Sequence, residues 1–161
     1  MRIKLFVMDV DGTLTDGHIY FGDNGEVMKA FHVRDGYAIA HTLPAKGIIP
    51  VIITGKTSEI VRKRATELKI PEVHQGISDK LAKLKDIAAK YNAVPDEIAY
   101  IGDDVNDLDC IAYCGVTACP ADAMDEVIAA VEYVCRHDGG RGAVREFADW
   151  VMKNSLQTNN D

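Results

Sequence analysis

Residues 5–15 read LFVMDVDGTLT, an apolar run that ends in two aspartates, a glycine and a threonine. Four consecutive apolar residues are typical of a parallel strand that is buried on both faces. Asp9 and Asp11 follow this strand, and Gly12 allows the backbone to turn sharply. An acidic strand end can cap a following helix, or it can present carboxylates to a ligand. The segment therefore predicts the first strand of an α/β fold.

Two further apolar runs have the same form. Residues 48–53 are followed by Thr54-Gly55-Lys56, and residues 98–101 by Gly102-Asp103-Asp104. In a doubly wound sheet, ligands bind beyond the carboxyl ends of the strands, near the point where the strand order reverses. We therefore predict a doubly wound, mainly parallel, Rossmann-like sheet whose reactive side chains gather at one edge.

Helical patterns lie between and after these strands. Apolar stripes at helical spacing run through residues 60–68 and 81–91. A further strand is expected near 116–118, and helices near 123–130 and 143–152. Residues 1–153 are expected to form one domain. The polar residues 154–161 lack apolar periodicity and are expected to form a mobile tail unless a partner orders them.

One segment interrupts the alternation of strands and helices. Residues 18–21 and 26–31 are strand-like and flank Gly22-Asp23-Asn24-Gly25, where Asn-Gly favours the positive φ angles of a hairpin turn. We predict a projecting β-hairpin at about residues 17–32. A helix at 36–46 follows, which Pro44 should shorten. These elements use most of the roughly 40 residues between Asp11 and Thr54, which leaves no room for a further inserted domain.

Composition and charge narrow the class of protein. The 161 residues are 47% hydrophobic and 27% charged, as in an ordinary globular domain, and no apolar run approaches the length of a membrane span. A formal net charge of −7 argues against nonspecific nucleic-acid binding. The chain runs directly into its first strand without an apolar leader, so we expect a cytoplasmic protein. Its four cysteines lack zinc-site spacing and are expected to be buried free thiols.

A second acidic cluster, formed by Asp103, Asp104 and Asp107, follows the third predicted strand. Two acidic clusters at strand ends of one sheet need a cation, and Mg²⁺ prefers oxygen ligands in octahedral geometry. Taken alone, Thr54 could cap a helix and Lys80 could be a solvated surface lysine. Their position in the chain relative to the acidic clusters is what makes them candidates.

The sequence resembles the haloacid dehalogenase superfamily, whose phosphatases carry Asp-x-Asp-Gly-Thr, as at residues 9–13, followed by the equivalents of Thr54, Lys80 and Asp103 in this order. The likeness spans nearly the whole chain. It implies a Mg²⁺-dependent phosphatase that forms an aspartyl-phosphate. The resemblance implies that Asp9 is the nucleophile and Asp11 the general acid and base. Thr54 and Lys80 would hold the phosphoryl group. Asp9, Asp103 and the backbone of Asp11 would bind the metal, and Asp104 and Asp107 would support the metal site.

Many members of this superfamily insert a cap domain after the first or second motif, for which this chain has no room, so it resembles the capless members. Among these, the sequence is similar to the 3-deoxy-D-manno-octulosonate 8-phosphate phosphatases and related sugar-acid phosphatases. The similar segments are Asp16-Gly17 and residues 29–36, 54–56 and 139–146. The likeness implies a small sugar-acid phosphate of lipopolysaccharide precursor synthesis as substrate, no nucleic-acid or membrane partner, and a homotetramer. Neighbouring subunits would pack on the hairpin and close the site, with Arg141 as a lid residue. The implied substrate-binding residues are His32, Val33, Arg34, Asp35, Gly36, Gly55 and Lys56. Arg64 is a further candidate, because the carboxylate of a sugar acid needs a cation, although it could equally belong to a solvated basic helix face.

Lys56 and Arg64 are further expected to share a helix face, because they are two helical turns apart. The octulosonate phosphatases often have arginine at the position of Lys56, and a related nine-carbon sugar-acid phosphatase has an acidic residue there. A lysine keeps the positive charge but lacks the bidentate geometry of arginine. The eight-carbon substrate is favoured, and the nine-carbon 9-phosphate stays an alternative.

Other functions compete with this interpretation. A response-regulator receiver also combines aspartates, Mg²⁺, Thr and Lys, but it is phosphorylated at its third strand and lacks Asp-x-Asp-Gly-Thr. A weakly active partner domain of a sugar-nucleotide synthetase would have negligible turnover on every substrate. A phosphatase for another sugar phosphate or for a phosphoprotein would also fit an open site.

Overall fold

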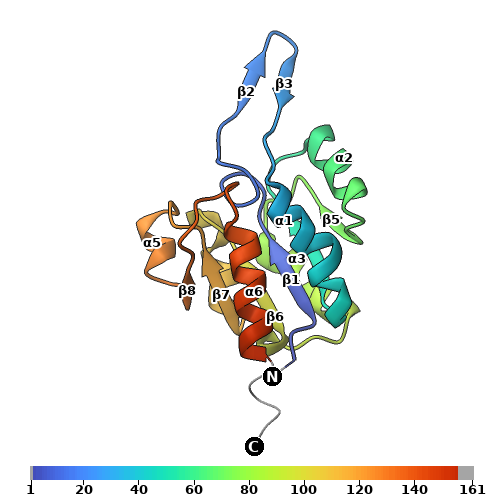
Figure 1. The fold of residues 1–161 in the computed structure, drawn as a ribbon, viewed down its shortest axis with the longest axis vertical. Coiled ribbons are helices and arrows are strands. Elements are labelled where there is room, and N and C mark those ends of the chain that lie inside the picture. Colours follow the sequence, from blue (N-terminus) through green and yellow to red (C-terminus); the bar gives the residue numbers. More distant parts are fainter. Residues whose placement is uncertain (1, 156–161) are drawn as a thin grey trace, which may run out of the picture.

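The computed structural model describes residues 2–155 and has a six-stranded parallel sheet at its centre (Figure 1). The strands lie in the order β5-β4-β1-β6-β7-β8, so the chain builds one half outward from β1 and then returns to build the other. This order confirms the predicted doubly wound sheet. The strands are β1 (Leu5–Met8), β4 (Ile49–Ile53), β5 (Glu72–His74), β6 (Ile98–Ile101), β7 (Val116–Cys119) and β8 (Tyr133–Val134).

Both faces of the sheet are covered by helices, because its central strands alternate apolar side chains between two cores. Phe6 and Met8 of β1 belong to one core, whereas Leu5 and Val7 belong to the other. The helices that contribute to the first core are α2 (Glu59–Glu67) and α6 (Ala143–Ser155), and those of the second are α3 (Lys80–Lys90), α4 (Leu108–Tyr113) and α5 (Asp125–Ile128). No helix in residues 2–155 has the length and apolarity of a bilayer span.

The predicted helix at 36–46 is wrong in its start and in its form. Helix α1 (Val33–Tyr37) begins earlier, because Nδ1 of the N-cap residue His32 accepts a hydrogen bond from the backbone N–H of Arg34 at 3.2 Å. The chain continues as a π-helical turn (Ala38–Thr42) and a 3₁₀ turn (Pro44–Lys46). Pro44 has no N–H to donate, so it begins the tighter turn instead of extending the helix.

Other differences concern short elements. Strands β5 and β8 and helix α4 were not predicted, because none has a long apolar run. Helix α5 is shorter than the expected 123–130. Helix α6 continues to Ser155, so the expected tail begins two residues too early, and residues 156–161 lie outside the described part of the chain. All four cysteines are free, and three are buried as predicted, whereas Cys114 is half-buried.

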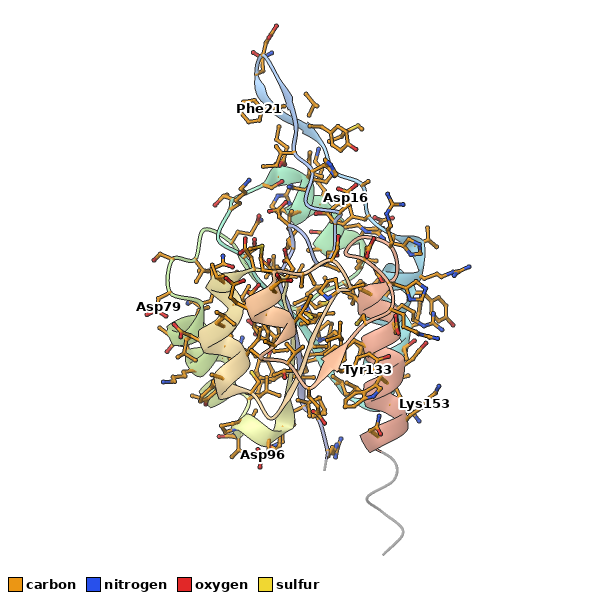
Figure 2. The ribbon with its side chains drawn as sticks, turned by 90° about the vertical axis from the view of Figure 1, so that its left-hand side faces the viewer. Asp16, Phe21, Asp79, Asp96, Tyr133 and Lys153 are labelled. Atoms are coloured by element: carbon orange, nitrogen blue, oxygen red, sulfur yellow. The ribbon has the colours of Figure 1, made fainter. Side chains whose placement is uncertain are left out.

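The predicted hairpin is present and projects beyond the carboxyl end of the central strand β1 (Figures 1 and 2). Strands β2 (Tyr20–Gly22) and β3 (Gly25–Met28) pair antiparallel. Gly25 has a φ of +102°, but Asn24 does not take the positive φ that we expected for it. Phe21 is 77% exposed near the tip, with Val27 and Met28 also exposed. Between Asp11 and Thr54, the chain contains this hairpin, α1, the short helical turns and β4, but no cap domain.

Candidate active site

The carboxyl ends of β1, β4 and β6 meet at one open pocket of about 300 Å³. Because β1 lies between β4 and β6, the residues that follow these three strands come together. The pocket is lined by Asp9, Asp11, Gly17, Thr54, Gly55, Lys56, Asp103, Asp104 and Asn106. The structure thus brings together most of the residues predicted for catalysis and metal binding.

A buried ion pair lies at the base of this pocket. Lys80, the first residue of α3, is 5% exposed, and its Nζ donates to Oδ1 of Asp9 at 3.0 Å and to Oδ1 of Asp107 at 2.8 Å. Burial lowers the pKa of Lys80, but the charges of Asp9 and Asp107 outweigh it, so the pKa is raised overall. Lys80 is therefore a charged group within the site and not a solvated surface lysine.

The acidic cluster fits a hard divalent cation. Oxygen atoms of Asp9, Asp103 and Asp107 lie within 4.8 Å of one another. Burial, and then repulsion from Asp107, raises the pKa of Asp9 to about 6 despite the attraction of Lys80. Burial and the charge of Asp9 raise the pKa of Asp103 to about 8. Carboxylates that resist ionisation next to one another are stabilised in their charged form by a cation.

Asp107 is oriented by four donors and has little capacity left for a metal. Its Oδ1 accepts from Lys80 and, at 2.6 Å, from the hydroxyl of Tyr100. Its Oδ2 accepts the backbone N–H groups of Asp103 and Asp104 at 3.0 and 3.3 Å. Asp107 therefore holds the loop that presents Asp103, while Asp104 also accepts the N–H of Val105.

The turn after β1 is fixed by close packing. Gly12 has a φ of +90°, and a Cβ placed there would lie 2.0 Å from Oδ2 of Asp103. The hydroxyl of Thr13 donates to Oδ1 of Asp103 at 2.9 Å. Only glycine combines this backbone conformation with so close an approach, so residues 12 and 13 set the distance between the two acidic loops.

The root of the hairpin contacts Asp11. Lys29 has a side chain that is 1% exposed, and its Nζ donates to Oδ1 of Asp11 at 2.5 Å and to Oε2 of Glu26 at 2.9 Å. Glu26 accepts from Oγ of Ser58, the N-cap of α2, at 2.5 Å. One network thus joins the hairpin, Asp11 and α2. The sequence did not predict the contact of Lys29 with Asp11, because no local pattern indicates that two residues 18 positions apart meet in the fold.

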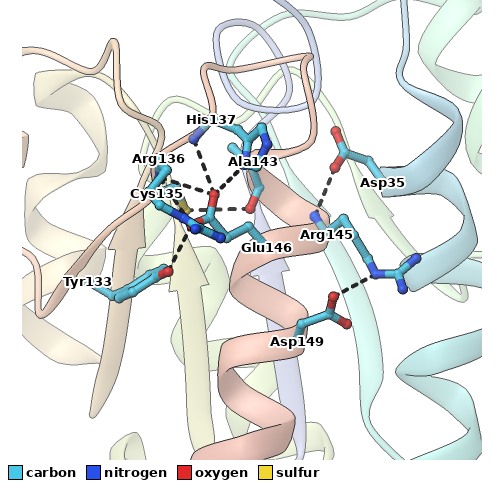
Figure 3. Close-up of polar contacts among 9 residues, drawn as sticks. All are labelled: Asp35, Tyr133, Cys135, Arg136, His137, Ala143, Arg145, Glu146 and Asp149. Carbon is cyan, nitrogen blue, oxygen red and sulfur yellow. Dashed lines mark hydrogen bonds and ion pairs between the residues drawn. The ribbon is translucent and has the colours of Figure 1, made fainter.

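Several predicted binding residues lie away from this pocket within the described chain. Residues 32–36 are the N-cap and the first four residues of α1. Asp35 is buried, and its Oδ1 accepts the backbone N–H of Arg145 at 2.8 Å (Figure 3). Arg64 lies over the Phe31 ring, 5.6 Å from its centroid, and pairs with Glu67. The expectation that Lys56 and Arg64 share a helix face is wrong, because α2 begins at Glu59, after Lys56.

The glycine-rich loop before α6 packs on its own chain. A Cβ at Gly139 would lie 1.9 Å from the carbonyl oxygen of Gly12, and the N–H of Gly140 donates to the carbonyl of Thr13 at 3.0 Å. The loop therefore supports the turn that carries Asp9 and Asp11. Asn106 and Gly17 also line the pocket and were missed. Asn106 had a signal, since it is a polar residue between two predicted acidic site residues.

Comparisons with known proteins give a consistent result. Residues 66–147 match the family of haloacid dehalogenase-like hydrolases. The chain is 43% identical over 151 residues to the 3-deoxy-D-manno-octulosonate 8-phosphate phosphatase KdsC of Escherichia coli strain K12, covering 94% of this chain and 80% of the relative. It superposes on the crystal structure of the same phosphatase from Yersinia pestis with a TM-score of 0.92, at 40% identity, covering 98% of this chain and 85% of the other.

A third similar protein was crystallised with ligands. The 3-deoxy-D-manno-octulosonate 8-phosphate phosphatase of Moraxella catarrhalis, in complex with a magnesium ion, a phosphate ion and a KDO molecule, gives a TM-score of 0.90 at 39% identity, covering 97% of this chain and 90% of that one. Similarity over nearly the whole chain excludes the receiver alternative. Together with the pocket at β1, these comparisons establish that the chain belongs to the haloacid dehalogenase-like hydrolases, as a KdsC-like phosphatase that hydrolyses phosphate monoesters.

Proposed function

We propose that this phosphatase uses Mg²⁺ to hydrolyse 3-deoxy-D-manno-octulosonate 8-phosphate to the free sugar acid and phosphate, through an aspartyl-phosphate on Asp9. The observation that carries the chemistry is the buried pair of Asp9 and Lys80 at the base of an open pocket that also contains Asp11 and Asp103. The similar phosphatases named above support the substrate. We also propose that residues 1–153 form one domain.

The site residues account for both halves of the reaction. A carboxylate oxygen of Asp9 attacks phosphorus, and the bond between phosphorus and the sugar oxygen breaks. Asp11 gives its proton to the departing alkoxide, and it later takes a proton from the water that attacks the aspartyl-phosphate and releases phosphate. Lys80 and Thr54 hold the phosphoryl oxygens. Mg²⁺, held by Asp9, Asp103 and the backbone of Asp11, supplies positive charge that offsets the charge on the transferring group.

Selection of the sugar acid needs a cation for its carboxylate. Lys56 lines the pocket and can supply one, which favours the eight-carbon substrate over the nine-carbon 9-phosphate. His32, Val33, Arg34 and Arg64 are partly or fully exposed and lie outside this chain's own pocket, so we propose that they contact substrate in the site of a neighbouring subunit. Asp35 and Gly36 are buried, so we propose that they act by positioning α1. Arg141 would act as a lid residue in the same way.

Closure of the catalytic pocket by a neighbouring subunit requires the chain to form an oligomer. An open site leaves the transition state exposed to water, and closure by another subunit would remove that water. The exposed apolar side chains of the hairpin, with Phe21 at 77%, are suited to an interface between subunits. We therefore propose that the protein forms a homotetramer. We also propose that it acts in the cytoplasm.

The test is phosphate release with and without Mg²⁺ over a panel of eight- and nine-carbon sugar-acid phosphates, hexose phosphates and a phosphopeptide. We expect a Mg²⁺-dependent preference for the octulosonate 8-phosphate. A nine-carbon preference would keep the mechanism but overturn the interpretation of Lys56. No release from any substrate would support a weakly active partner domain of a sugar-nucleotide synthetase.

A further inference from the structure

Asp11, the proposed general acid and base, is held by a lysine from inside the protein. Asp11 lines the catalytic pocket, and its side chain is 21% exposed. Nζ of Lys29 donates to Oδ1 of Asp11 at 2.5 Å. Among residues 2–155, no hydrogen bond is made to Oδ2 of Asp11. One oxygen of the carboxylate is therefore fixed, while the other is left for proton transfer.

Lys29 is a buried charge with two carboxylate partners. Besides Asp11, its Nζ contacts Oε2 of Glu26, a residue of the hairpin strand β3, at 2.9 Å. Burial lowers the pKa of Lys29, but the hydrogen bonds and charges of Asp11 and Glu26 outweigh it, so the pKa is raised overall. A buried ammonium group is tolerated when it is paired in this way. Lys29 therefore stays positively charged beside Asp11.

Glu26 is in turn anchored to α2. Its Oε1 accepts from Oγ of Ser58, the N-cap of α2, at 2.5 Å. The backbone N–H of Ser58 donates to Oε1 of Gln75 at 2.8 Å. The path from Asp11 to Gln75 thus joins the turn after β1, the hairpin, the start of α2 and the loop after β5. A displacement of Lys29 would therefore break contacts on both sides of its ammonium group.

Neither Lys29 nor Glu26 lines the catalytic pocket, so any effect on the reaction has to act through Asp11. A general acid transfers its proton only within hydrogen-bond reach of the leaving oxygen. A displacement of ~1 Å can lower the rate by about 100-fold. A half-exposed carboxylate without an internal partner would exchange between rotamers. The contact with Lys29 restricts that freedom at the residue that has to move the proton.

We propose that Lys29 is a positioning residue for the general acid and base: it fixes Oδ1 of Asp11 so that Oδ2 faces the leaving oxygen. The root of the hairpin is thereby part of the catalytic machinery, although it lies outside the pocket. This inference rests on the role proposed for Asp11 and adds the group that orients it. Loss of Lys29 should therefore affect only the steps in which Asp11 moves a proton.

Two leaving groups distinguish positioning of the acid from a general effect. The alkoxide of octulosonate 8-phosphate needs a proton from Asp11, whereas p-nitrophenolate is a stable anion and does not. The ratio kcat/KM covers the steps up to departure of the first product, in which Asp11 acts as the acid. We expect Lys29→Met to lower kcat/KM by roughly 10- to 100-fold for the sugar phosphate and by less than about threefold for p-nitrophenyl phosphate. Loss of a charge that merely attracts phosphate would weaken both alike.

A double variant tests whether Lys29 acts through Asp11. Asp11→Asn alone should lower kcat/KM for octulosonate 8-phosphate by at least about 100-fold, with a much smaller loss for p-nitrophenyl phosphate. Adding Lys29→Met to Asp11→Asn should cause no more than about a twofold further loss, because the group that Lys29 orients is already absent. Losses that multiply would show that Lys29 acts independently of Asp11 and would overturn the inference.

Lys63→Met is the matched control, because it makes the same change at an exposed position of α2, and it should leave both kcat/KM values unchanged. Circular dichroism checks that each variant is folded. Glu26→Gln weakens one anchor of Lys29 and leaves Asp11 in place, so we expect a loss of roughly threefold that is confined to the sugar phosphate. This variant decides the question if Lys29→Met does not fold.

The leaving groups also separate this inference from the proposed function. If Asp11→Asn behaves as expected but the Lys29 and Glu26 variants lose activity equally on both substrates, or lose none, the role of Lys29 is wrong and the mechanism stands. If Asp11→Asn itself loses activity equally on both substrates, the proposed acid role of Asp11 is wrong, and the inference falls with it.

Discussion

At the scale of single residues, the site depends on one buried lysine shared by two aspartates. Lys80 donates to both Asp9 and Asp107, and all three side chains are less than 10% exposed. Buried charges are tolerated only when they are paired and hydrogen-bonded. Because Asp107 remains a partner of Lys80, a change at Asp9 can remove the nucleophile without leaving the lysine uncompensated.

We expect Asp9→Asn to lower phosphate release by at least about a thousandfold while the protein stays folded, because an amide of similar shape replaces the nucleophilic carboxylate. Phosphate release and thermal unfolding followed by circular dichroism check both parts. Asp86→Asn on α3 is the control, since the Asp86 side chain is 77% exposed. Near-normal activity of Asp9→Asn would disprove the aspartyl-phosphate mechanism.

Alanine variants of Gly12 and Gly25 distinguish the energetic cost of a positive φ from that of a Cβ clash. Both have a φ near +100°, but a Cβ at Gly12 would clash with Asp103, whereas one at Gly25 would meet nothing within 4 Å. We expect each alanine variant to lose about 1 kcal/mol of stability from the backbone conformation. Only Gly12→Ala should also lose most of its activity and its affinity for Mg²⁺, measured by phosphate release against Mg²⁺ concentration. Equal activities of the two variants would contradict this account of the turn.

At the scale of elements, Glu146 fixes the chain after β8 to α6. Besides its side-chain partners, it accepts the backbone N–H groups of Arg136 and His137 at 3.0 and 3.2 Å. Burial raises the pKa of Glu146, but the hydrogen bonds from His137, Arg136 and Tyr133 outweigh it and lower the pKa to about 2. This carboxylate therefore stabilises the folded state when it is ionised.

We expect Glu146→Gln to reduce the free energy of unfolding at pH 7 by about 2 kcal/mol, because charge-assisted hydrogen bonds are lost. The folded-state pKa is depressed, so the contribution is present above the ordinary value near 4.5 and disappears as the pH falls toward 2. Urea unfolding at pH 7 and pH 3 measures the difference. The exposed Glu132→Gln is the control. A deficit that is equally large at pH 3 would show that the charge is not its source.

At the scale of the whole molecule, the hairpin is the feature that a single chain leaves unexplained. Its strands are only three and four residues long, and an isolated two-stranded hairpin is marginally stable in water. Its root is tied to the catalytic pocket through Lys29, whereas its two strands expose Phe21 and Met28. Packing against other copies would bury these side chains.

We therefore expect Phe21→Asp combined with Met28→Asp to disrupt assembly, because buried charge would oppose association of the hairpins. Sedimentation velocity measures the oligomeric state, and the substrate panel measures selectivity in the same samples. Val94→Asp, which changes an exposed apolar residue in another part of the chain, is the control. Wild-type sedimentation of the double variant would contradict the interface, and unchanged selectivity in a monomer would contradict the lid.

The sequence by itself determined the sheet, the hairpin and the acidic strand ends, because these follow from local rules. Short apolar runs such as residues 5–8, bounded by glycine and polar residues, are typical of buried strands, and Asp9 and Asp103 lie one and two residues after such runs. Short segments such as Glu72–His74 carry too little local signal. Only the tertiary structure decided which distant residues meet: Lys29 with Asp11, Asp107 with Lys80, and Asp35 with the start of α6. The physical reason is that these contacts depend on how elements pack, and the spacing of residues along the chain does not specify that packing.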